Sequence, residues 1–298
     1  MKRVLIVGCG DVARRAFPWL VRRFRVYAVT RRSDARESLR AAGVTPLLAD
    51  LDDRRSLERL GGLADYVLHF APPAATGDID VRTRRLIAAL RRGQSLPHRI
   101  VYISTTGVYG DCMGEEVDET SPCRARTARA LRRVDAERRL RDFARRGGAS
   151  VVVLRAPGIY AAERLPLQRL ERALPVLRVD EDVHTNHVHA DDLARAACMA
   201  LFRGGNGRVY NAADRSDLRM GEYFDLVADL FDLPRAPRMS RQQITEHLSP
   251  MALSFMSESR RVCGERLRRE FRLRFEHPTV RDGLLAALRQ IKGDPAGC

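Results

Sequence analysis

Short hydrophobic runs alternate with amphipathic stretches along the first half of the chain. The runs are rich in Val, Leu and Ile and occupy residues 4–7, 25–30, 45–49, 66–70, 99–104 and 151–154. Between them, apolar residues recur every three or four positions, the spacing of one helix face, over residues 12–24, 33–43, 56–60, 79–92 and 127–145. Strands of a parallel sheet are buried on both faces and are joined by helices, which produces this alternation. The pattern predicts an α/β fold with a doubly wound parallel sheet.

Local signals predict where several helices begin and which faces they bury. Ser33 is placed to cap the helix that Gly43 would end. In the helix over 127–145, the inward stripe is expected to comprise Leu131, Val134, Leu140 and Phe143.

After Pro157 the alternation ends. Helices are predicted over 191–202, 221–231 and 265–290, the last interrupted at Pro278, with one late strand over 208–211. Ser240 followed by Gln243 has the spacing of a capping box. This half is therefore expected to form a smaller, mostly helical cap.

Composition narrows the class of protein. No apolar run approaches the ~20 residues that a membrane helix needs. The start of the chain resembles a lipoprotein signal, but its apolar core covers only residues 4–7, which is short of the ~7–15 residues of such signals. The six cysteines form no Cys-x-x-Cys pair and have no neighbouring His cluster. We expect free thiols, no metal site and a cytoplasmic protein.

The chain is strongly basic, with a formal net charge of +15 and 53 Lys and Arg residues. Lys2 and Lys292 are its two lysines, and the remaining basic residues are arginines. A large positive charge attracts polyanions, so binding to nucleic acid is one hypothesis. Phe143 is the one aromatic residue in the arginine-rich stretch 124–146, which offers no stacking platform for bases. A solvated, arginine-coated helix is the interpretation we favour, without a nucleic-acid partner.

A glycine-rich turn follows the first predicted strand and opens the first predicted helix. It comprises Gly8, Cys9, Gly10, Asp11, Val12 and Ala13. In a Gly-x-Gly-x-x-Ala turn, the first Gly permits the tight turn, the second permits close approach of a pyrophosphate, and Ala permits helix–strand packing. The free N–H groups of the helix N-terminus suit phosphates. The context predicts a Rossmann-type dinucleotide site.

The end of the second strand bears on the choice of cofactor. An acidic residue there would bind the ribose hydroxyls of NAD, but this chain has Arg31 and Arg32. Guanidinium groups suit a 2′-phosphate, so we expect NADP, with NAD as the second choice. Asp50, after the third strand, is expected on the adenine side. The segment Ala71, Pro72 and Pro73 follows the fourth strand, where the cofactor would cross the sheet edge.

Three further segments resemble one known family. These are Ile103-Ser104-Thr105-Thr106-Gly107-Val108-Tyr109-Gly110, Leu154-Arg155-Ala156-Pro157-Gly158-Ile159-Tyr160 and Asn186-His187-Val188-His189-Ala190-Asp191-Asp192. They resemble the strand-five, strand-six and late-helix motifs of extended short-chain dehydrogenases/reductases, the NAD(P)-dependent epimerase/dehydratase family, over residues 3–290. The resemblance implies cofactor contacts by Leu51, Ser104, Pro157, Gly158 and Ile159. It also implies a substrate pocket with Thr106, Tyr160 and His187.

The chain departs from the family at its catalytic pair. The family uses a Ser or Thr, which Thr105 matches, with a Tyr and a Lys four residues later. Anchored on Glu137, the Tyr position holds Arg129 and the Lys position holds Arg133. Arginine stays protonated, so it can bind a ribose hydroxyl but cannot relay protons near neutral pH.

Three functions therefore stay open. The first is an NADP(H)-dependent oxidoreductase or epimerase acting on a small carbonyl or sugar-nucleotide-like substrate, with Thr105, Tyr109 and Arg133 as catalytic residues. His187 and His189 are alternative proton donors because imidazole titrates near neutral pH. The second is a non-catalytic NADP(H) sensor, and the third a nucleic-acid-associated protein. We expect an NADP-binding domain over residues 1–158 and a substrate-capping region over 159–298, with segments around 183–212 returning to the sheet, in a monomer or homodimer.

Overall fold

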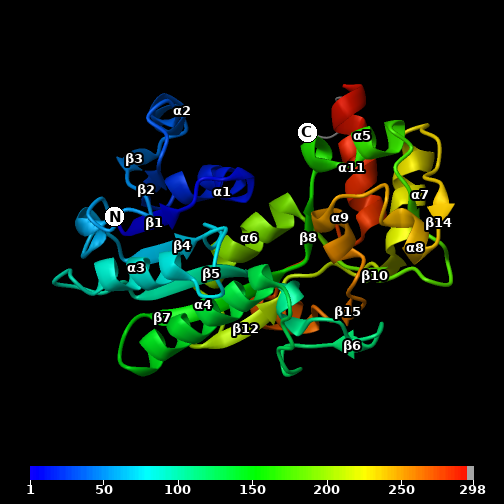
Figure 1. The fold of residues 1–298 in the computed structure, drawn as a ribbon. Helices are drawn as coiled ribbons and strands as arrows, with labels where there is room; N and C mark the ends of the chain where they lie inside the picture. Colours follow the sequence, from blue (N-terminus) through cyan, green and yellow to red (C-terminus); the bar gives the residue numbers. More distant parts are fainter. Residues whose placement is uncertain (294–298) are drawn as a thin grey trace.

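A computed structural model of the protein describes residues 1–293, and its main element is a seven-stranded parallel sheet (Figure 1). The strand order is β3-β2-β1-β4-β5-β7-β12, the order of doubly wound Rossmann folds. The strands are β1 (Arg3–Val7), β2 (Arg25–Thr30), β3 (Thr45–Leu48), β4 (Tyr66–His69), β5 (Arg99–Thr105), β7 (Ser150–Ala156) and β12 (Arg208–Asn211). The predicted α/β fold with a parallel sheet is confirmed.

Helices cover both faces of the sheet, so the strands other than the edge strand β3 are largely buried on both sides. One face carries α1 (Asp11–Val21) and α6 (Ala190–Ala200), and the other carries α3 (Val81–Leu90) and α4 (Ala128–Arg145) (Figure 1). The short helix α2 (Ala35–Ala41) packs beside β2 and β3. Each face has its own hydrophobic cluster, the first around Phe17 and Leu193 and the second around Leu86 and Leu140.

The second half of the chain adds a smaller body beside the sheet, on the right in Figure 1. Its longest helices are α7 (Met220–Leu230) and α11 (Val280–Lys292), which share a hydrophobic cluster around Tyr160, Val227 and Leu284. The remaining helices of this half are α5 (Leu167–Glu171), α8 (Arg241–Ile244), α9 (Pro250–Phe255) and α10 (Glu265–Phe271). The short strands are β6 (Glu116–Val117), β8 (Gly158–Tyr160), β9 (Val176–Leu177), β10 (His184–Thr185), β11 (His187–His189), β13 (Leu218–Arg219), β14 (Arg238–Met239) and β15 (Arg261–Val262). Single 3₁₀ turns span η1 (Glu58–Leu60), η2 (Thr106–Tyr109) and η3 (Ala162–Arg164).

A buried carboxylate ties the smaller body to the sheet. Asp192 of α6 is fully buried, and its two oxygens accept hydrogen bonds from the backbone N–H groups of Glu276 (2.7 Å) and His277 (2.9 Å), which precede α11. Arg195 also pairs with this carboxylate, at 3.2 Å. A buried carboxylate is stable only when it is paired and hydrogen-bonded, and here most of its partners come from the far end of the chain.

Two local predictions are wrong. Ser33 does not cap α2, because the N-cap residue is Asp34, whose carboxylate is instead held by Arg32 at 3.0 Å and 2.5 Å. Leu131 is 38% exposed rather than inward-facing. The buried face of α4 includes Asp135 and Glu137, which ion pairs keep in the interior, and hydrophobic spacing cannot reveal such a face. The capping box at Ser240 and Gln243 is confirmed.

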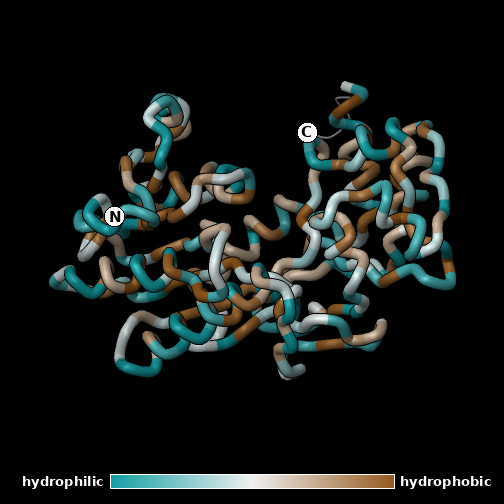
Figure 2. Tube along the Cα trace, in the orientation of Figure 1, coloured by the Kyte–Doolittle hydropathy of each residue, from teal (hydrophilic) through white to brown (hydrophobic). Residues whose placement is uncertain are grey.

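Figure 2 shows hydrophobic positions along the strands of the sheet and hydrophilic positions on the peripheral turns. Within residues 1–293, no helix is both long enough and apolar enough to cross a membrane. Five cysteines in this range are free thiols, as predicted, and Cys298 lies outside the described residues. The same range contains no cluster of His, Cys, Asp and Glu suited to a metal ion.

Candidate cofactor and substrate site

The strand register brings the predicted site residues to one edge of the sheet. Val7 at the end of β1 pairs with Val29 of β2 on one side and with His69 of β4 on the other. At the end of β5, Thr105 pairs with Ala156 of β7. In open α/β sheets, ligands bind beyond the carboxyl ends of the strands, where the strand order reverses. Here that reversal lies between β1 and β4.

The glycine turn after β1 has the geometry that its sequence predicts. Gly8 has a φ of +96°, and a Cβ added there would lie 2.5 Å from the backbone nitrogen of Ala71. Gly10 faces open space, with no atom within 4 Å of an added Cβ. Ala13 and Val12 are buried, so α1 starts close against the sheet. Gly8 is therefore needed by the fold itself, whereas the space beside Gly10 is free for a ligand.

A cavity of about 260 Å³ opens beside this turn, at the ends of β1 to β4. The structure brings together eight of the predicted cofactor residues there: Gly8, Cys9, Arg31, Arg32, Asp50, Leu51, Ala71 and Pro72. Sequence reasoning missed Arg82 of α3, which also lines the cavity. Its guanidinium donates to the carboxylate of Asp52 and to the carbonyl oxygens of Pro72 (3.1 Å) and Pro73 (3.3 Å).

The two arginines after β2 are not equivalent. Arg32 is engaged by Asp34, whereas Arg31 has no carboxylate within 4.0 Å in the described part of the chain. The Cys9 thiol donates to the Val29 carbonyl at 3.2 Å, and burial raises the pKa of this thiol to about 11, so it stays protonated. Arg31 thus keeps guanidinium donors that no carboxylate in residues 1–293 uses.

Asp11, at the start of α1, belongs to an ionic network that reaches the smaller body. Its carboxylate accepts from Arg15 at 2.9 Å and lies 3.3 Å from Arg164. Arg15 also binds Glu163 and, at 2.7 Å, Asp191. The network holds three carboxylates and two arginines, so these cations offset the Asp11 charge only in part.

A second cavity, of about 290 Å³, lies at the ends of β5 and β7. It contains the predicted residues Thr105, Thr106, Arg133, Pro157 and Gly158. The other side is formed by the smaller body, through Ser254 and Phe255 of α9, His184, Thr185, Asn186, Met220, Glu258 and Arg260. The hydroxyl oxygen of Thr105 accepts the Gly107 N–H at 3.2 Å, and its own proton remains available to donate.

Arg133, at the family's lysine position, is anchored to β5. It donates to the carbonyl oxygen of Ile103 at 2.6 Å and to the Tyr102 hydroxyl at 3.1 Å. Arg129 lines the same cavity one turn earlier in α4. Both positions of the missing catalytic pair therefore face the cavity, and each presents a guanidinium.

Three predicted site residues have hydroxyl groups that form hydrogen bonds within the protein interior and do not line these cavities. Tyr109 is fully buried and donates to Asn211 at 2.7 Å, and burial raises its pKa to about 12. Tyr160 is buried and donates to the carbonyl oxygen of Thr279 at 3.2 Å. Ser104 is buried and donates to Glu137 at 2.5 Å. Each of these hydroxyls already donates its proton to an acceptor within the protein. Ile159 packs against the hydrophobic core.

A third cavity, of about 390 Å³, adjoins the second, since Thr185, Met220 and Phe255 line both. His187 lines it, and burial lowers the pKa of this imidazole to about 4, which makes it neutral at pH 7. His189 lies elsewhere: its Nδ1 accepts the Asp191 N–H at 3.3 Å, and its ring is 3.8 Å from that of His277.

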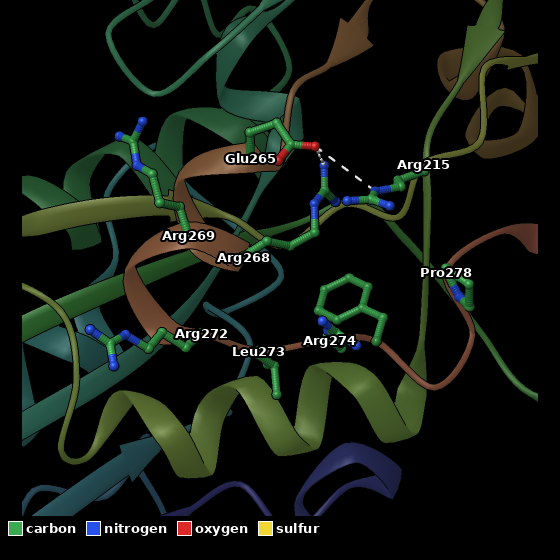
Figure 3. Close-up of a pocket in the computed structure, with 9 residues that line it drawn as sticks. Arg215, Glu265, Arg268, Arg269, Arg272, Leu273, Arg274 and Pro278 are labelled. Carbon is green, nitrogen blue, oxygen red and sulfur yellow. Dashed lines mark hydrogen bonds and ion pairs between the residues drawn. The ribbon is translucent and has the colours of Figure 1, made fainter.

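A fourth cavity, larger than these three at about 850 Å³, contains none of the predicted site residues (Figure 3). It lies around α10 and the segment that follows it, and five arginines line it with a single acidic residue, Glu265. Arg268 and Arg215 are directed towards Glu265, whereas Arg269 and Arg272 point away from it (Figure 3). None of its lining residues belongs to the segments that follow β1 to β5, so size alone does not identify the site.

Arg129, Glu258 and Arg260 are functional candidates that the sequence did not single out as cavity residues. Arg260 and Glu258 come from the segment before β15, which carries no local motif. The alignment of α4 on Glu137 was the available signal for Arg129. The position of Arg129 in the cavity depends on the contact between its guanidinium on α4 and the Phe255 ring of α9.

Comparisons with known proteins agree with this geometry. The model of the NAD dependent epimerase/dehydratase family matches residues 18–213. A structure of a functionally unknown conserved protein from Silicibacter pomeroyi DSS is 28% identical, with a TM-score of 0.78 over 97% of this chain and 99% of that one. The UDP-glucose 4-epimerase of Thermus thermophilus in complex with NAD is 21% identical, with a TM-score of 0.76 over 98% and 99% of the two chains.

Two relatives of known activity match a smaller part of this chain than these structures do. A ketoreductase of Stigmatella aurantiaca, which acts on 4-hydroxy-2-methyl-3-oxo-4-farnesyl-3,4-dihydroquinoline-1-oxide, is 25% identical over 245 residues, or 77% of this chain and 73% of its own. The dTDP-D-glucose 4,6-dehydratase of Mus musculus is 26% identical over 121 residues, 38% of this chain. The match spans 34% of the mouse protein, about a third of its length.

Proposed function

Because the chain belongs to the NAD-dependent epimerase/dehydratase family, we propose that it is an oxidoreductase that binds NADP(H) and acts on a small carbonyl compound. The observation that carries the proposal is the pair of cavities along one sheet edge. One opens at the glycine turn, and the other is lined by Thr105 and Arg133. The Stigmatella relative is a ketoreductase, which supports carbonyl reduction.

The residues at the first cavity fit a dinucleotide with a 2′-phosphate. The open space at Gly10 and the N–H groups of α1 suit the pyrophosphate, and Arg31 suits the 2′-phosphate because it has no carboxylate partner among the described residues. Asp50 and Leu51 suit the adenosine. When bound, the nicotinamide supplies hydride chemistry.

In the second cavity, Thr105 binds and orients the substrate oxygen through its free hydroxyl proton. Arg133 keeps donors for a ribose hydroxyl, but it holds its proton throughout. We assign proton transfer to His184, whose Nδ1 lies 3.2 Å from the Asp217 carboxylate. An imidazole can donate one proton and accept another, and a carboxylate beside it can orient the ring. Replacing His184 with Asn is expected to lower kcat by about a hundredfold or more, the usual contribution of a positioned proton-transfer group, whereas an unchanged kcat would remove it from this role.

The substitution of both catalytic positions by arginine supports a second candidate, a non-catalytic NADP(H) sensor. The two functions differ in turnover, so one experiment separates them. Calorimetric titration with NADP⁺ and NAD⁺ measures binding, and nicotinamide absorbance with a panel of ketones then measures reduction. Tight NADP(H) binding with turnover supports the enzyme. Binding without any turnover supports the sensor, and no binding of either cofactor refutes both.

A further inference from the structure

The cavity at Thr105 carries more positive charge than its own residues neutralise. Three arginines line it, and Glu258 is the acidic residue among the lining side chains. Glu258 is already paired with Arg260, at 2.8 Å. Within residues 1–293, neither Arg129 nor Arg133 has a carboxylate within 4.0 Å. The cavity therefore keeps an excess of two positive charges in this part of the chain.

The placement of Arg129 makes this excess unfavourable without a ligand. Arg129 and Arg133 are four residues apart on α4, where like charges repel. Burial lowers the pKa of Arg129; the nearby Glu258 carboxylate acts in the opposite direction, and the neighbouring Arg133 and Arg260 lower the pKa further. Its guanidinium is held 4.4 Å from the centre of the Phe255 ring, so α9 fixes it over the cavity. An anion bound there would relieve the repulsion.

The adjoining cavity has a different character. Besides His187 and Phe255, it is lined by Met220, Tyr223, Phe224, Met251 and Ala252, with the hydroxyl side chains of Thr185 and Ser249. Its one charged lining side chain, Arg169, lies 4.5 Å from the Phe224 ring centre and donates to the Pro175 carbonyl at 3.0 Å. A wall of Met and aromatic side chains favours an apolar group and penalises an unpaired polar one. The second cavity thus favours an anionic group and the adjoining cavity favours an apolar group. A single amphipathic molecule could supply both.

We infer that the substrate is a carbonyl acid with an apolar tail, whose carboxylate is bound by Arg129 and Arg260 while the tail occupies the cavity around Tyr223 and Met251. The inference rests on the proposed function, since Thr105 is taken to orient the carbonyl. Arg260 suits the role because its Nε is buried and has no hydrogen-bond partner among the described residues. A sugar nucleotide would place polar hydroxyls or phosphates against the apolar wall.

The test is calorimetric titration of the NADP⁺-loaded protein with phenylpyruvate, which has a carboxylate, a ketone and an apolar ring. We expect Arg129→Gln to weaken its binding by roughly tenfold to a hundredfold, the usual loss for a hydrogen bond to a charged group. The matched control is Arg145→Gln, which removes the same charge from an exposed arginine at the far end of α4. That variant is expected to bind phenylpyruvate like the wild type.

Phenylacetone, which lacks the carboxylate, gives a measurement that needs no variant. It is expected to bind the wild type at least tenfold more weakly than phenylpyruvate, and Arg129→Gln should not weaken it further. Equal binding of the two compounds, unchanged phenylpyruvate binding in Arg129→Gln, or tighter binding of UDP-glucose would overturn the inference while leaving cofactor binding intact. The titrations are repeated without cofactor. Failure of the proposed function would then appear as absent NADP⁺ and NAD⁺ binding. The comparison of phenylpyruvate with phenylacetone would still test carboxylate binding in the protein without cofactor.

Discussion

The buried ion pair between Glu137 and Arg155 joins α4 to β7, two residues before Pro157 of the second cavity, and its removal has a calculable cost. The side chains are 1% and 3% exposed, with Nη2–Oε2 and Nε–Oε1 distances of 2.7 Å and 3.1 Å. Ser104 donates to the same carboxylate. Glu137→Gln keeps the side-chain volume but leaves a buried guanidinium without its counter-charge. Breaking a buried pair in this way costs about 3–5 kcal/mol of unfolding free energy.

The measurement is urea unfolding at 25 °C, together with thermal unfolding. A loss of 3–5 kcal/mol corresponds to a fall in Tm of roughly 6–20 °C for a chain of this size. Asp142→Asn is the control, because its partner Arg145 is 79% exposed and such surface pairs contribute about 0–1 kcal/mol. The double variant Glu137→Leu with Arg155→Met should recover much of the loss, since it leaves no unpaired charge. A loss in Glu137→Gln no larger than in Asp142→Asn would refute the reasoning.

Four other predictions concern the site and the pH dependence of stability. Gly10→Val should abolish cofactor binding by calorimetry but keep the wild-type Tm, because a Cβ there meets no protein atom; retained affinity would contradict the pyrophosphate assignment. Arg31→Asp should shift the preference from NADP⁺ towards NAD⁺, and an unchanged affinity ratio would place the 2′-phosphate elsewhere. Thr105→Val should lower kcat at least tenfold for any ketone that the wild type reduces, and full activity would exclude this residue. Burial raises the pKa of Asp214 to about 7, above its unfolded value near 4, so the protonated carboxyl stabilises the fold at low pH and this contribution is lost as pH rises to 7. Asp214→Asn should therefore gain stability relative to the wild type between pH 5 and pH 8 in urea unfolding, and a constant difference would contradict the shift.

The sheet and the glycine turn could be predicted because both depend on local sequence. The spacing of hydrophobic residues differs between strands and helices, so the sequence separates the two. The turn at Gly8 needs a residue that tolerates positive φ, which glycine does. Tyr109 shows the limit: its place after β5 put it near the site, but its direction is set by Asn211, 102 residues away. The same holds for Arg260, which reaches the cavity from the smaller body. Contacts between distant segments decide which side chains face a ligand, and no spacing in the sequence encodes them.

The carboxylate of Asp192 bears on how the chain can be divided. It lies in α6, against the sheet, yet two of its hydrogen bonds come from the backbone of Glu276 and His277. A protein truncated before Glu276 would keep all seven strands of the sheet and lose these donors. The helix α6 that packs on the sheet would then contain a fully buried carboxylate with Arg195 as its remaining charged partner. Changes around Glu276 and His277 are therefore expected to destabilise the sheet from a distance.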